Sequence, residues 1–103
     1  MTTPVYMFAQ IDVKDYESYA EQYGLPVAQM FAEVGAKILV ATPQVELLEG
    51  TWSGNWTVLV EIPSAEVARQ LYDSERYAPF KRARIDRLTD GGTLAILPGL
   101  GPA

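Results

Sequence analysis

Apolar residues follow two different spacings along this chain. In short runs rich in β-branched and aromatic residues, nearly every position is apolar, whereas in longer stretches the apolar residues recur every three or four positions. The first pattern is typical of strands and the second of amphipathic helices. The sequence therefore predicts strands at 5–13, 36–41, 56–62 and 93–97, and helices at 16–34 and 65–88.

Capping and breaking residues mark the ends of these elements. Asp15 and Ser64 precede the two helices and are suitable N-caps, and Gly35 fits the position that follows a helix. Gly24 and Pro26 predict a break or kink inside the first helix. The other irregular segments are predicted as a helix break at 73–74 with Ser74 as a second cap, a hairpin arm at 43–54, a turn at 90–92 and a loose tail at 98–103.

The order of the elements is strand-helix-strand, arm, strand-helix-strand. Two right-handed units of this kind predict an α+β fold with a four-stranded sheet and both helices on one face. The strands are apolar in both phases, because Val5 and Met7 alternate with Tyr6 and Phe8 in the first of them. Helices on one face would leave the other apolar face bare, so we expect a second copy to cover it in a homodimer. The alternative is a monomer with an apolar sheet face.

Composition narrows the possible functions. The 103 residues predict a single domain over 1–103, with a core at about 5–97. Histidine and cysteine are absent, which excludes imidazole bases, thiolate nucleophiles and disulfides and fits a cytoplasmic location. The net charge of −5 argues against nucleic acid as a partner. We see no signal peptide or membrane-spanning run, and no metal or nucleotide motif, so we expect no membrane association and no cofactor.

Several runs resemble a known family. They are the opening QIDVKDYESY, the later LLEGTW and VLVEIPS, and the run LYDSERY in the last helix. In this combination the chain is similar, over about 5–97, to the domain-of-unknown-function family 1330. The resemblance implies a ferredoxin-like βαββαβ protomer of the dimeric α+β barrel superfamily, in which two antiparallel sheets close face to face. Relatives in that superfamily include monooxygenases, cyclases, isomerases and dehydratases of small, often aromatic or polyketide molecules.

The chain departs from that family in two places. Asn55 and Trp56 stand where the family tends to carry an arginine before the third strand, and Ile62 stands where phenylalanine is frequent. If the family's arginine helps to hold a ligand, this chain has lost that contact or changed its ligand.

Arg84 is the most pointed candidate for a functional residue. It shares a stripe of the predicted last helix with Tyr77 and Leu88, so its guanidinium faces the apolar side. A cation in that place needs a partner, which can be a protein carboxylate or an anionic ligand such as a carboxylate or phenolate. The alternatives are a structural salt bridge or a side chain that extends to solvent at the helix end.

Two polar residues lie within predicted strands. Glu61 has apolar neighbours, and Lys37 can lie opposite it and form a cross-strand ion pair if the second and third strands pair. The alternative is a half-buried carboxylate with a raised pKa that acts as a general acid or base. Gln10 in the first strand is a candidate for hydrogen bonding to a ligand.

The arm and the break in the last helix supply further candidates. Glu49 on the arm is a second possible proton carrier, and Trp52 is either a pocket lid or an interface anchor. Tyr72 and Tyr77 flank the helix break and can present hydroxyls to a ligand, although aromatic residues at helical spacing also suit a core.

Together these residues suggest a homodimeric small-molecule enzyme with a pocket between the sheet and the helices. Arg84 would anchor an anionic or aromatic substrate, and Glu61 or Glu49 would move a proton. Because no nucleophile–base pair is evident, an isomerase, cyclase or lyase fits better than a hydrolase. A cofactor-free monooxygenase, a non-catalytic ligand-binding homodimer and a purely structural module are the alternatives. The aromatic walls of the pocket are expected from Tyr6, Phe8, Trp52, Tyr72 and Tyr77.

Overall fold

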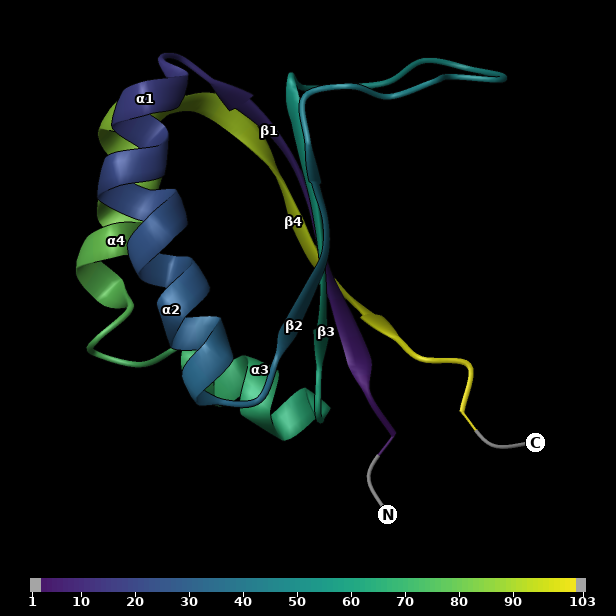
Figure 1. The fold of residues 1–103 in the computed structure, drawn as a ribbon, viewed down its shortest axis with the longest axis vertical. Helices are drawn as coiled ribbons and strands as arrows, with labels where there is room; N and C mark the ends of the chain where they lie inside the picture. The colour runs from purple at the N-terminus through teal and green to yellow at the C-terminus, as the bar shows by residue number, and fades with distance from the viewer. Residues whose placement is uncertain (1–2, 102–103) are drawn as a thin grey trace.

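The computed structural model of this protein describes residues 3–101. Within that range the chain forms a four-stranded antiparallel sheet with the strand order β2-β3-β1-β4. Figure 1 shows the labelled helices together on one side of the sheet. This arrangement confirms the predicted α+β, ferredoxin-like class. The strands are β1 (Val5–Val13), β2 (Lys37–Thr42), β3 (Trp56–Ile62) and β4 (Thr89–Pro98).

The first helical segment has no break but contains a π-helical turn where the sequence predicted a break or kink. It runs through α1 (Tyr16–Tyr19), the π-helical η1 (Ala20–Gly24) and α2 (Leu25–Glu33). Gly24 keeps helical dihedral angles, and Pro26 lies in the first turn of α2, where a missing N–H is tolerated. The wider π turn absorbs the irregularity that we had expected to break the helix.

The predicted caps of the first helical segment are confirmed. The carboxylate of Asp15 accepts a hydrogen bond from the Ser18 N–H at 3.2 Å. At the other end Gly35 has φ of +79°, and the Ala36 N–H donates to the Phe31 carbonyl at 2.9 Å. This six-to-one bond is the Schellman termination that a glycine favours.

The second helical segment is interrupted as predicted. Its parts are α3 (Ala65–Tyr72), α4 (Ala78–Ala83) and the π-helical η2 (Arg84–Leu88). Ser64 caps α3 by accepting from the Val67 N–H at 3.2 Å. Ser74 caps the turn that precedes α4, because its hydroxyl accepts from the Tyr77 N–H at 3.1 Å.

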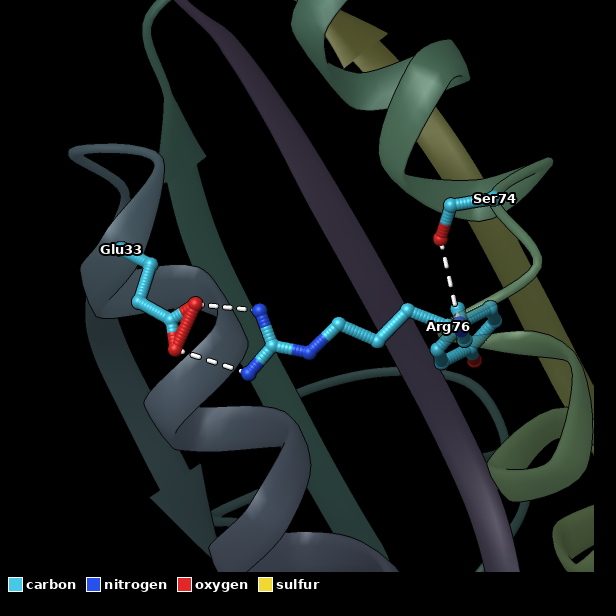
Figure 2. Close-up of polar contacts among 4 residues, drawn as sticks. Glu33, Ser74 and Arg76 are labelled. Atoms are coloured by element: carbon cyan, nitrogen blue, oxygen red, sulfur yellow. Dashed lines mark hydrogen bonds and ion pairs between the residues drawn. The ribbon is translucent and has the colours of Figure 1, made fainter.

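An ion pair joins this interruption to the end of α2. The guanidinium of Arg76 donates from both terminal nitrogens to the carboxylate of Glu33, one of them at 2.8 Å (Figure 2). The two side chains are largely exposed, so the pair lies on the outer surface of the helical layer.

The predicted turn at 90–92 is wrong. Asp90, Gly91 and Gly92 belong to β4, where the pairing with β1 shifts register between Ile11 and Val13. Gly92 lies so close to β1 that a Cβ atom there would be 2.6 Å from the Gln10 carbonyl oxygen. The glycines therefore permit a bulge and a close backbone approach instead of a turn.

The first part of the tail at 98–103, which was predicted to be loose, is held by backbone pairing. Pro98 is part of β4, and the Gly99 N–H donates to the Pro4 carbonyl at 3.2 Å. Residues 102 and 103 of that predicted tail lie outside the described residues.

The arm between β2 and β3 projects from the sheet on the side away from the helices (Figure 1). No strand is formed over 43–54, the segment predicted as a hairpin arm. Leu48 is among the most exposed apolar side chains of the arm, at 84%.

The sheet has two different faces. Val5, Met7, Ala9 and Ile11 alternate as buried residues along β1 and pack beneath the helices. Tyr6, Phe8 and Gln10 occupy the intervening, half-buried positions, on what we call the open face. The pairing registers place Leu59 of β3 opposite Phe8 and also opposite Val40 of β2. The strands are therefore apolar on both faces, as predicted.

Candidate functional site

The residues predicted to form one pocket lie on opposite sides of the sheet. Arg84, Tyr72 and Tyr77 belong to the helical layer, where Tyr72 and Tyr77 pack with ring centroids 5.8 Å apart. The other candidates lie on the open face or on the arm: Tyr6, Phe8, Gln10, Trp52, Glu49 and Glu61. A pocket between the sheet and the helices cannot contain both sets within one protomer, which corrects the expected arrangement.

Arg84 faces the interior as the helical stripe predicted. It begins η2, its guanidinium carbon lies 5.7 Å from the centre of the Tyr23 ring, and it lines a small internal cavity. Its Nε atom is buried and has no hydrogen-bond partner among residues 3–101. Within the same range no carboxylate pairs with it, so the structural salt bridge offered as an alternative is not formed.

A pair of tyrosine hydroxyls lies beside this arginine. The Tyr23 and Tyr77 oxygens are 2.5 Å apart in a buried hydrogen bond, which joins η1 to the residue before α4. Burial opposes the charge on Arg84, but the facing hydroxyls of Tyr23 and Tyr77 outweigh it and raise the pKa of the guanidinium. Burial also raises the pKa of Tyr19 and of Tyr23 above the ordinary tyrosine range. Arg84, Tyr19 and Tyr23 therefore stay protonated at neutral pH.

Tyr23 was not singled out as a candidate from the sequence. The available signal was the helical spacing of Tyr19 and Tyr23 on the apolar side of the first helix, since a buried tyrosine hydroxyl needs a hydrogen-bond partner. The partner came from the distant helical segment, so the spacing alone could not identify it.

Two adjoining hollows lie between the helices and the sheet, and Arg84 lines the inner one. The internal cavity measures about 40 Å³ and is lined by Arg84, Tyr19, Tyr23 and apolar residues of β1 and β3. It shares Tyr19, Tyr23 and Val58 with a neighbouring cleft of about 210 Å³ between the first helical segment and the β2–β3 edge. No Asp or Glu among the described residues lines either space.

The outer end of the cleft opens into a wide groove of about 710 Å³ at the base of the arm. The groove shares Tyr16 and Trp56 with the cleft and adds the exposed cation Lys14. Tyr16 and Trp56 pack together with ring centroids 4.9 Å apart. Tyr16 and Trp56 therefore lie where the groove adjoins the cleft. Lys14 lines the outer groove, and Arg84 lines the inner cavity.

Asn55 stands where the resembling family tends to carry arginine. Its side chain and backbone here hold two strands together. Its side-chain oxygen accepts from the Val13 N–H at 2.8 Å, and its side-chain nitrogen donates to the Val13 carbonyl at 2.9 Å. Its own N–H donates to the Ile11 carbonyl at 2.9 Å. Asn55 thus ties the end of β1 to the start of β3, beside the groove.

The open-face candidates contact one another. The Tyr6 hydroxyl donates to a Glu61 carboxylate oxygen over 3.4 Å, a long and weak hydrogen bond. Lys37 is the strand partner of Glu61, as expected, but within residues 3–101 the two side chains form no ion pair. Trp52 packs edge-on against Phe8 at 6.2 Å and donates to the Thr57 hydroxyl at 3.3 Å.

Gln10 and Glu49 complete the account of the predicted site residues. Gln10 is half-buried on the open face, opposite Thr57 and Thr93 of the neighbouring strands. Glu49 is exposed on the arm. Across the described part of the chain, no cluster of Asp and Glu side chains is arranged to hold a metal ion.

Two comparisons identify the class of this protein. Residues 4–100 match the family described as a domain of unknown function, DUF1330. Because the match spans nearly the whole chain, the protein belongs to that family, as its sequence motifs suggested. No curated protein matches the chain significantly.

Solved structures share the fold of this chain. The chain resembles a crystal structure of RPA0582, a protein of unknown function from Rhodopseudomonas palustris, with a TM-score of 0.76 at 19% identity. That match covers 99% of this chain and 86% of the other. A structure of methylated RPA0582 gives a TM-score of 0.75 at 18% identity, over 99% and 84% of the two chains. At such identities the likeness establishes the fold alone.

The helices were also compared with the length of a bilayer. None of those within residues 3–101 is long and apolar enough to cross a membrane. The cytoplasmic location expected from the absence of cysteine stays a prediction.

Proposed function

We propose that this protein binds a small aromatic anion in the cleft between its helices and its sheet, and that it acts on that molecule as a cofactor-independent isomerase, cyclase or lyase. The observation that supports this is Arg84, a cation at the inner end of an aromatic cleft with no carboxylate partner among the described residues. Such a guanidinium gains most from an anionic ligand that completes its hydrogen bonds.

The size of the cleft suits one ring with a short substituent. An apolar protein cavity of about 150 Å³ accommodates a benzene molecule. The cleft and its inner cavity measure about 210 and 40 Å³ and are lined by tyrosine, tryptophan and aliphatic side chains. We therefore favour single-ring aromatic molecules over larger polyketide-like ones.

The proposed catalytic groups differ from those expected from the sequence. Glu61 and Glu49 lie outside the cleft of their own protomer, whereas the Tyr23–Tyr77 pair lies beside Arg84. Protonated tyrosines and a guanidinium can stabilise negative charge that develops on a substrate oxygen during isomerisation. Because no described carboxylate lines the cleft to move a proton, a ligand-binding dimer without catalysis is the second candidate function.

We propose that two copies pair through their open faces. Tyr6, Phe8, Val40 and Leu59 share this face, and Val40 is 38% exposed in the single chain. The arm projects on the same side and carries the exposed Leu48, so it can reach around a partner (Figure 1). Monomeric proteins rarely leave so much contiguous apolar surface uncovered.

The ligand-binding part of the proposal is tested by calorimetric titration with charged and neutral molecules of matched shape. Benzoate is paired with benzamide, and 2,4-dinitrophenolate with 2,4-dinitroanisole. We expect an anion to bind at least tenfold more tightly than its neutral counterpart. Arg84→Met should reduce anion affinity by about 10- to 100-fold, the usual weight of hydrogen bonds to a charged group.

Arg82→Met is the matched control, because Arg82 is exposed on α4, two residues from Arg84. It removes the same charge from the chain and should leave anion affinity unchanged. Equal anion affinities in the wild type and Arg84→Met would show instead that Arg84 does not bind the anion.

A further inference from the structure

The contact between Tyr23 and Tyr77 uses only one of their two hydroxyl protons. Each tyrosine hydroxyl carries one proton and accepts through its lone pairs. The two oxygens are 2.5 Å apart, and the other polar side chain that faces them is Arg84, which can donate to them but cannot accept. One O–H donor is therefore left without an acceptor, in a buried place where an unmade hydrogen bond is costly.

The neighbouring arginine has the same deficit. The Nε–H of Arg84 is buried without an acceptor in the described part of the chain. The titratable groups that face it are Tyr23 of η1, Tyr77 before α4 and Tyr19 of α1. The Arg84 Nε–H and one tyrosine O–H are thus left without an acceptor at the inner end of the cleft, and a ligand that satisfies them must bring one.

The small inner cavity limits the shape of that acceptor. Its volume of about 40 Å³ is far below the roughly 150 Å³ of an apolar cavity that holds a benzene molecule. Such a space takes a polar atom on the edge of a ring but not the ring itself. The wider apolar cleft beyond it then accommodates the ring itself.

The backbone gives a separate indication that this place is specialised. Tyr23 lies within η1, and Arg84 is the first residue of η2. Both segments are π-helical, a rare conformation that recurs at functional sites. The two irregular turns come from distant parts of the sequence, and each contributes one side chain to the cavity lining.

From these observations we propose that the inner end of the cleft is an oxyanion hole that binds a planar phenol or enol in its ionised form. The single oxygen accepts hydrogen bonds from Arg84 and from the Tyr23–Tyr77 pair, while the ring lies against Tyr19, Phe31 and Val58. The phenol's O–H bond breaks on ionisation, its electron pair stays on the ligand oxygen and the proton passes to buffer. This inference rests on the proposed function and narrows its ligand to phenols and enolisable ketones.

The test uses 4-nitrophenol, whose phenolate absorbs visible light and whose phenol form does not. Absorbance is followed against pH with the protein in saturating excess, and then in buffer alone. We expect the ionisation midpoint of the bound molecule to fall by at least one pH unit, a tenfold preference for phenolate. Arg84→Met should move the midpoint above that in buffer, because an apolar cleft without its cation disfavours charge.

Two further variants separate the tyrosine pair from the arginine. Tyr77→Phe leaves Arg84 in place but removes one hydroxyl, so the midpoint should fall by less than in the wild type. Arg82→Met should behave as the wild type. Circular dichroism verifies that each variant is folded. If a variant fails to fold, 4-nitroanisole decides with the wild type alone, because this ether cannot ionise and should bind at least tenfold more weakly than 4-nitrophenolate.

The possible failures are distinguishable. If 4-nitrophenol binds but its midpoint is unchanged or raised, or if the ether binds as tightly as the phenolate, the oxyanion hole is refuted while the cleft still binds aromatic ligands. If neither benzoate nor either nitrophenol binds, the proposed function itself is refuted.

Discussion

The two faces of the sheet differ in the kind of polar group that they carry. The helix-covered face holds Arg84 and the Tyr23–Tyr77 pair next to a cleft, and the Arg84 Nε–H has no acceptor in the described structure. The open face holds Glu61, a carboxylate, among exposed apolar side chains. Neighbouring residues of one strand point to opposite faces, so the buried Val60 and the half-buried Glu61 belong to different environments although they are adjacent in sequence.

This difference separates the proposed ligand site from the proposed dimer interface. A carboxylate on the open face cannot reach a ligand beside Arg84 in the same protomer, and a dimer formed through that face would cover Glu61. A substitution on one face of the sheet therefore makes no direct contact with the residues on the other face. The predictions below use this independence, and the largest effect is expected where a second copy covers an apolar surface.

Leu59→Glu should convert the proposed homodimer to a monomer. Leu59 lies in the central pair of strands on the open face, between Phe8 and Val40. Burying an unpaired carboxylate at an apolar interface is expected to weaken association by about 100-fold or more. Light scattering after gel filtration measures the mass, and anion binding to the cleft should survive in the monomer.

The matched control is Gln29→Glu, which adds the same charge at an exposed position of α2. That variant should keep the mass of the wild type. A wild-type protein that runs as a monomer at micromolar concentration, or a Leu59→Glu variant that stays dimeric, would contradict pairing through the open face.

Asn55→Ala should have the next largest effect, on stability. Asn55 lies just before β3 and beside the end of β1, and its side chain makes two hydrogen bonds to the backbone of Val13. Losing both should reduce the free energy of unfolding by about 1–3 kcal/mol, which corresponds to a fall in melting temperature of about 5–15 °C. Thermal unfolding followed by circular dichroism measures this change.

Asn55→Asp provides the graded control for that measurement. Aspartate keeps an oxygen that can accept from the Val13 N–H but removes the donor to the Val13 carbonyl. Its melting temperature should therefore lie between those of the wild type and the alanine variant. Equal stability of all three proteins would show that the contact contributes nothing.

The elements of the fold followed from local signals in the sequence. The third strand was predicted with the bounds that β3 has, and Asp15, Ser64 and Gly35 cap their helices as expected. Each of these signals depends on residues a few positions apart. Gly92 misled the interpretation, because the close approach of β1 that requires a glycine there comes from residues about eighty positions away.

The candidate site was only partly predictable, for a related reason. The helical stripe placed Arg84 inward correctly, but β1 and β3 are apolar in both phases, so the pattern could not show which phase faces the helices. For that reason Glu61 was assigned to the same pocket as Arg84. The Tyr23–Tyr77 contact joins residues 54 positions apart, and it depends on the packing of two helical segments.

The smallest predicted effect concerns the Arg76–Glu33 pair, which lies on the outer helical surface away from both sheet faces (Figure 2). Arg76 has a carboxylate partner within the protein, whereas Arg84 has none among the described residues. The hydrogen bonds from Arg76 hold the pKa of the Glu33 carboxyl below its ordinary value of 4.5. A lowered folded-state pKa stabilises the protein above pH 4.5, and that contribution is lost as the pH falls through the lowered value.

Glu33→Gln should therefore lower the melting temperature slightly at pH 7 and have a diminishing effect as the pH approaches 3. Because both side chains are exposed, 0.5 M salt should reduce the difference at pH 7 as well. Arg84→Met should behave in the opposite way, with a melting temperature that is unchanged or higher at both salt concentrations, since that guanidinium has no protein carboxylate to lose. If the two substitutions gave the same dependence on pH and salt, Arg84 would be paired within the protein, and the contrast between the two faces would lose its basis.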